Sequence, residues 1–99
     1  MYILIIDDIP SGIAINAAAH GSLACFLKFA SCRSMQEWLA SSFKKVTCKV
    51  TPEELGKAMV QCPDHVVITE SSLGHRVVGA AFCPRASWHE MFSTFKLYK

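Results

Sequence analysis

The chain opens with a run of apolar residues that has no polar alternation. Positions 3–6 read Ile-Leu-Ile-Ile, and a strand of this kind is covered on both faces, which places it centrally in a sheet. We predict this strand over residues 2–7, where Asp7-Asp8 ends it. The turn Pro10-Ser11-Gly12 follows, and Ser11 is the predicted N-cap of a helix.

That helix is predicted to extend to Ala30 and is unusually rich in small residues. The run Ala17–Ala19 and Gly21 carry little side-chain bulk, so another element can approach this helix closely. Asn16 and His20 lie four positions apart and therefore share one helix face. The opening of the chain thus predicts a buried strand, a tight loop and a buried helix.

The rest of the pattern predicts three more strands and three more helices. Residues 45–50 alternate strictly, which indicates a half-exposed strand, and residues 65–69 and 77–82 form two further strands. The link between these two is too short for a helical crossover, so they form an antiparallel hairpin. The spacing of a capping box, Ser or Thr followed three residues later by Glu, predicts helix starts at Ser34, Thr51 and Ser87.

The resulting element order is β-α-α-β-α-β-β-α. This order predicts an α/β fold with a mixed four-stranded sheet and helices on both faces, built by residues 1–99 as a single domain. The apolar fraction of 52% and the charged fraction of 18% argue against disorder. Because a short chain has limited capacity to bury apolar surface, a homodimer is expected.

Composition excludes several classes of function. No apolar stretch is long enough to span a bilayer, and no basic region precedes the first apolar run, so we expect neither a membrane span nor a secretory signal. A net charge of +2 is too small to indicate nucleic acid by itself. Five cysteines without a C-x-x-C pair predict buried, reduced thiols in a cytoplasmic protein.

Few residues stand out as candidates for chemistry. Asp7 and Asp8 are candidate metal ligands or bases, although solvated loop acids are the plainer interpretation. His20, in a mostly apolar helix, is either a general base or a core or interface histidine. The histidines follow no zinc pattern and neither G-x-G-x-x-G nor a P-loop occurs, so no metal or other cofactor is expected. Five lysines could join into a solvated face or a phosphate-binding surface: Lys44, Lys45, Lys49, Lys96 and Lys99.

Two stretches resemble type II peptidyl-tRNA hydrolases. The segment D-D-I-P-S-G-I-A with N-A-A-A-H, which ends at His20, resembles the opening of that family, and F-K-L-Y-K, which ends at Lys99, resembles its close. Residues 44–55 resemble the family's strand and following helix start. The resemblance spans nearly the whole chain and implies a mixed four-stranded sheet, commonly in a dimer.

The match is poorer at the family's catalytic positions. Family members carry M-G-K-G-K and then A-x-Q-x-x-H, whereas here the loop is I-P-S-G-I and lacks both lysines. The histidine is present as His20, Asn16 precedes the position of the glutamine, and the family's acidic residue falls near Glu70. The opening looks closer to a divergent branch of the superfamily that carries D-L-P-x-G-L-A-x-N-A-A.

The resemblance supports two hypotheses. In the first, the protein hydrolyses the ester of peptidyl- or aminoacyl-tRNA. His20 and Glu70 then handle water and protons, and substrate is positioned by Ser11, Asn16 and Ser71. In the second, it is a non-catalytic dimeric binding module that kept the fold and lost the chemistry with the lysines. A positive surface around His20 would favour the first hypothesis, because tRNA phosphates and a developing negative charge both need cations.

Overall fold

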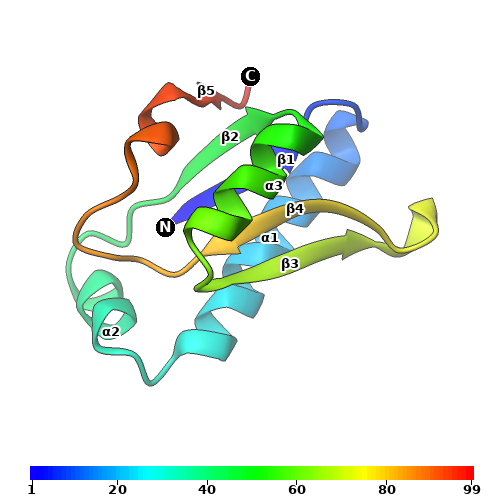
Figure 1. Cartoon of the computed structure of the whole chain (residues 1–99). Coiled ribbons are helices and arrows are strands. Elements are labelled where there is room, and N and C mark those ends of the chain that lie inside the picture. The colour runs from blue at the N-terminus through cyan, green and yellow to red at the C-terminus, as the bar shows by residue number, and fades with distance from the viewer.

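The first strand lies at the centre of a five-stranded mixed sheet with the order β3-β4-β1-β2-β5 (Figure 1). The computed structural model describes all 99 residues. β1 pairs in parallel with β2 and antiparallel with β4, and β3 and β4 form the predicted antiparallel hairpin. The strands are β1 Tyr2–Ile6, β2 Val46–Val50, β3 His65–Glu70, β4 Arg76–Phe82 and β5 Lys96–Leu97.

Three α-helices accompany the sheet. They are α1 (Ser11–Phe29), α2 (Arg33–Ala40) and α3 (Pro52–Gln61). α1 and α3 cover opposite faces of the sheet, and α2 lies beyond the end at which β1 begins (Figure 1). The predicted α/β class with helices on both faces is therefore confirmed.

The position of β1 follows from its sequence. Each of the four residues Ile3–Ile6 is at most 2% exposed, as expected for a strand covered on both faces. Ile3 and Ile5 stand opposite Ala81 and Gly79 of β4, so these residues share the sheet face that α1 covers. The alternate residues of β1 point to the other face.

Small residues let α1 approach the sheet closely. Its buried positions are Ala14, Ala17, Gly21 and Cys25, all of them small. A Cβ at Gly21 would collide with the Ile68 side chain and lie 3.4 Å from Ala81 Cβ. The short side chains of the helix, rather than a large apolar stripe, therefore set the distance between α1 and the strands beneath it.

Only one of the predicted helix caps is correct. Thr51 Oγ1 accepts from the Glu54 amide at 3.1 Å, and Glu54 Oε1 accepts from the Thr51 amide at 2.9 Å, which completes the box before α3. The prediction of Ser11 as N-cap is wrong, because Pro10 occupies that place and Ser11 is the first helical residue. α2 likewise begins one residue before Ser34.

The end of the chain differs from the prediction. In place of an α-helix from Ser87, a 3₁₀ helix η2 (Glu90–Thr94) is capped by His89 and followed by β5, so the sheet has five strands instead of four. Aromatic packing explains the change. Phe92 lies 5.0 Å from the Tyr2 ring and 5.2 Å from the Phe82 ring, which draws the segment onto the sheet in a single short turn.

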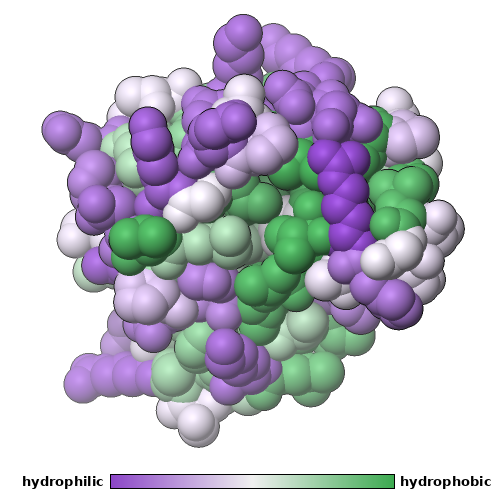
Figure 2. Space-filling model, turned by 45° about the vertical axis from the view of Figure 1, so that its right-hand side comes forward, coloured by the Kyte–Doolittle hydropathy of each residue, from purple (hydrophilic) through white to green (hydrophobic).

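The sheet is not evenly covered. α3 packs over β1, β2 and β4, and on the edge strand β3 Val67 is 49% exposed. In Figure 2 the tip of the β3–β4 hairpin comes forward, and hydrophobic side chains gather in a shallow hollow bordered by hydrophilic ones. Apolar surface therefore remains open on this side of the protein.

Gly79 provides a test of the close contact between β4 and β1. A Cβ at this position would collide with the Leu4 backbone oxygen and lie 3.0 Å from Ile5 Cδ1. We expect Gly79→Ala to lower the free energy of unfolding by about 2 kcal/mol or more, because backbone cannot give way as a side-chain tip can. Urea denaturation of the purified variant measures this change.

Gly56→Ala is the matched control. Gly56 lies within α3, and a Cβ there would meet no atom within 4 Å. Alanine in a helix interior is favoured over glycine by about 1 kcal/mol, so this variant should be as stable as the wild type or more so. Equal losses in the two variants would contradict the close contact at Gly79.

Candidate functional site

A cavity of about 310 Å³ lies between α1 and the end of the β3–β4 hairpin. α1 contributes Asn16, Ala17 and His20, and the remaining wall comes from β3 and the turn that follows it. That second set consists of Ile68, Thr69, Glu70, Ser71 and His75. Two segments about 50 positions apart in the sequence thus meet at one place.

The close packing of α1 positions His20. Gly21, the next residue, is buried against Ile68 of β3, and Ala17 is buried one turn earlier. His20 itself is exposed on the flank of the helix and lies beside Asn16, as their four-residue spacing predicts. The small residues therefore bring the imidazole to the wall of the cavity without burying it.

Glu70 ends β3 and caps the 3₁₀ turn η1 (Ser71–Leu73). Its Oε1 atom accepts from the Ser72 amide at 3.3 Å and from the Ser72 hydroxyl at 2.8 Å. These bonds fix the orientation of the carboxylate at the cavity wall. The carboxylate makes no hydrogen bond or ion pair with His20.

Sequence reasoning missed His75 as a lining residue. Gly74 and His75 both adopt a positive φ, of 66° and 61°, which tightens the hairpin turn and brings His75 to the cavity. Glycine before a polar residue between two strands is a turn signal that could have found this position. The cavity thus holds two imidazoles and one carboxylate.

Ser11 lies outside this group. It is exposed at the first turn of α1 and is not among the residues that line the cavity. Of the five predicted site residues, the structure therefore brings together Asn16, His20, Glu70 and Ser71 and leaves Ser11 apart.

No lysine or arginine lines the His20 cavity. Arg76, opposite Glu70 in the hairpin, is the nearest candidate by register, but its Nη2 atom donates to Asp8 at 2.8 and 3.0 Å. Two of the five lysines considered as a solvated or phosphate-binding face, Lys49 and Lys96, pair across β2 and β5 at the other side of the sheet. The cavity is therefore not a positive surface.

The acidic pair after β1 and the remaining polar residues form no metal centre. Asp8 is engaged by Arg76 and Asp7 is exposed. No group of three or more His, Cys, Asp or Glu side chains is placed to hold a metal ion. No helix combines the length and apolar character needed to cross a bilayer.

The cysteines differ in exposure. Cys25, Cys48, Cys62 and Cys83 are buried, as predicted, but Cys32 is exposed. Burial raises the pKa of Cys25 to about 12, and it also raises the pKa of Cys48 and Cys83. Because their pKa values are raised, these three thiols stay protonated near neutral pH, and none of them is an activated nucleophile.

No protein-family model matches the chain, and no curated protein matches it.

The difference in exposure among the cysteines gives a testable prediction. In the folded protein one thiol, Cys32, should react with 5,5′-dithiobis(2-nitrobenzoate), and the four buried thiols should react only after denaturation. Stopped-flow absorbance at pH 8 measures the amplitude of the fast reaction, which counts the accessible thiols. Cys32→Ser should abolish it, and a second fast thiol in that variant would contradict the buried positions.

Proposed function

We propose that this protein is a divergent type II peptidyl-tRNA hydrolase-like enzyme that hydrolyses the ester of peptidyl- or aminoacyl-tRNA in the cytoplasm. The observation that carries the proposal is the meeting of Asn16, His20, Glu70 and Ser71 around one cavity. These are the residues that the resemblance and the chain order single out. A general base, a carboxylate and two hydrogen-bonding groups around one cavity suit the attack of water on an ester.

The roles follow from the chemistry of each group. His20 takes a proton from water, whose oxygen then bonds to the ester carbonyl carbon. Asn16 and Ser71 donate hydrogen bonds to the carbonyl oxygen as negative charge develops on it. When the ester C–O bond breaks, the ribose hydroxyl leaves with a proton from the imidazolium. Glu70, held by Ser72, lines the same cavity without bonding to His20, and its negative charge favours that imidazolium through space.

The size of the cavity limits what enters it. At about 310 Å³ it is at the lower end of the range for small-ligand pockets, so it suits the aminoacyl end of the substrate. The nucleic acid would have to lie on the surface outside it.

A second candidate function is favoured by the charge of the site. No lysine or arginine lines the cavity, and Arg76, which lies outside the lining, pairs with Asp8, so no lysine or arginine is placed against a phosphate or an oxyanion there. The same residues then form a binding site without lysine or arginine in a non-catalytic module, since fold alone does not determine activity. The acid–base groups of the site therefore favour the enzyme and its lack of lysine and arginine favours the binding module, and an activity assay distinguishes the two.

The deciding assay is hydrolysis of N-acetylaminoacyl-tRNA by the purified protein. If the first proposal holds, His20→Ala should lower kcat/KM by about 100-fold or more, because a positioned general base contributes that much. Release of labelled N-acetylamino acid, followed over time, measures the rate.

His89→Asn is the control for this assay. His89 is exposed, lies outside the cavity and caps η2 through Nδ1, and asparagine keeps a cap acceptor. Its turnover should equal that of the wild type. No turnover above buffer with the wild type overturns the enzyme proposal and leaves the binding module.

We also propose that the protein is a homodimer and that α1 forms the contact. Ile15, Leu23 and Leu27 are 61–69% exposed, and with Ala19 they form a stripe at four-residue spacing that contains no charge. A stripe of this kind on a helix is self-complementary across a two-fold axis. It adjoins Asn16 and His20, so a partner would border the cavity.

Leu23→Glu tests the dimer. Placing a charge in the stripe should shift the protein to monomer in sedimentation equilibrium at micromolar concentration, because an unpaired charge would be buried in the contact. Val60→Glu is the control, since Val60 is 80% exposed on α3, and it should leave the mass unchanged. A monomeric wild type at these concentrations removes the proposal.

A further inference from the structure

A second cavity, of about 720 Å³, lies at the end of the sheet opposite to His20. Four segments build it: the start of β1, helix α2, the connection from α2 to β2, and the chain that follows β4. These segments come together on one side of Figure 1, where β1 begins. The cavity shares no lining residue with the His20 cavity and has more than twice its volume.

Three aromatic side chains, Tyr2, Trp38 and Trp88, are among its lining residues. Tyr2 and Trp88 pack edge to face with centroids 4.9 Å apart, and Phe92 supports Trp88 from 5.2 Å. Trp38 is held from the other side, since its Nε1 atom donates to the Lys44 carbonyl at 2.7 Å. Tyr2 and Trp88 are half-buried, so fixed rings with part of their surface exposed are available to a planar ligand.

The charge of this cavity is positive. Arg33, Lys44 and Arg85 line it, and Glu37 is the one acid among the lining residues. The Lys44 ammonium makes no hydrogen bond or ion pair within the chain. The cations that the His20 cavity lacks are therefore present here, beside the aromatic wall.

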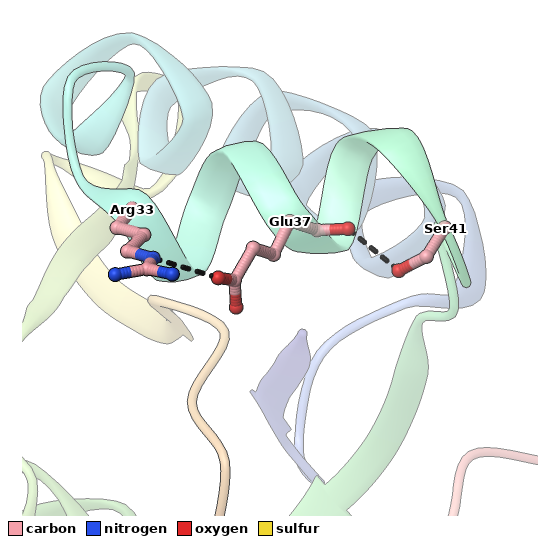
Figure 3. A network of polar contacts seen from close by, with 3 residues as sticks. All are labelled: Arg33, Glu37 and Ser41. Carbon is pink, nitrogen blue, oxygen red and sulfur yellow. Dashed lines mark hydrogen bonds and ion pairs between the residues drawn. The ribbon is translucent and has the colours of Figure 1, made fainter.

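The ion pair between Arg33 and Glu37 determines whether the Arg33 guanidinium is available to a ligand. Figure 3 shows both side chains on one side of α2, with Arg33 Nε 2.9 Å from Glu37 Oε1. Their side chains are 92% and 65% exposed, and exposed pairs of this kind contribute little, so an anion can replace Glu37 as the partner of Arg33. A guanidinium also binds a carboxylate or phosphate through two parallel hydrogen bonds.

We propose that this cavity binds a small aromatic anion, with the ring against Trp88 and Tyr2 and the acidic group between Arg33 and Lys44. The inference rests on this cavity alone and is independent of the hydrolysis proposed at His20. A volume of about 720 Å³ is within the range of pockets that enclose a whole small ligand.

The chain offers an internal reporter of occupancy. Trp38 and Trp88 are its two tryptophans, and both line the cavity. Titration of ¹⁵N-labelled protein with 2-naphthoate should therefore shift both indole N–H signals and saturate. The amide 2-naphthamide and the non-aromatic anion cyclohexanecarboxylate should each bind about tenfold more weakly, because each lacks one half of the recognition.

Three variants test the charge. Arg33→Gln and Lys44→Gln should each weaken 2-naphthoate binding by about tenfold, and Glu37→Gln should tighten it several-fold by freeing Arg33. Lys57→Gln, on the exposed side of α3 and outside the cavity, should leave the affinity unchanged. All four residues are exposed, so their replacement spares the core.

Two outcomes would overturn the proposal. One is the absence of saturable shifts at the indole signals with 2-naphthoate at millimolar concentration. The other is an affinity that stays the same for the neutral amide or in the Arg33 and Glu37 variants, since that would mean adsorption to apolar surface without recognition of the anion. Loss of binding in Lys57→Gln would count against it in the same way.

Discussion

The close contact between α1 and the sheet is the constraint on which the rest of the structure depends. Bulk is excluded from the helix side of this contact at Gly21, where a Cβ would collide with the Ile68 side chain of β3. Since β1 is covered on both faces, α1 must take one of them with α3 on the other. The depth at which α1 sits then decides that His20 reaches the end of β3, and the His20 cavity is a consequence of the helix packing.

Structural features could be predicted from the sequence where the pattern of residues was compatible with only one local structure. The unbroken apolar run of β1 predicted its central place, because an alternative position would expose isoleucines to water. Thr51 could be predicted as the N-cap of α3, because Pro52 fixes the first helical residue and Glu54 completes the capping box. The same spacing failed elsewhere: Glu37 pairs with Arg33 instead of returning to Ser34, whose hydroxyl lies 3.8 Å from Cys83 Sγ.

The candidate sites were predictable to different degrees, for a physical reason. Asn16 and His20 share a helix face, so local periodicity alone placed them together. His75 reaches their cavity through a positive-φ turn, which local spacing does not reveal. The larger cavity draws Tyr2, Trp38 and Trp88 from three distant segments, and its aromatic wall exists because η2 is pulled onto the sheet where an α-helix was expected.

The positions of the charged residues do not favour the hydrolase hypothesis in its simplest form, in which cations lie beside His20. Cations gather with aromatic rings where β1 begins, whereas the imidazoles and Glu70 gather at the other end of the sheet without a cation. The two cavities share no lining residue, so in the proposed hydrolysis the transition-state charge at His20 would be met by hydrogen-bond donors alone. Neutral donors stabilise an oxyanion less than a lysine does. If the protein hydrolyses an ester at this site, the reaction is therefore expected to be slower than in an enzyme with the lysine-rich loop, and the ligand binding proposed at the larger cavity does not depend on it.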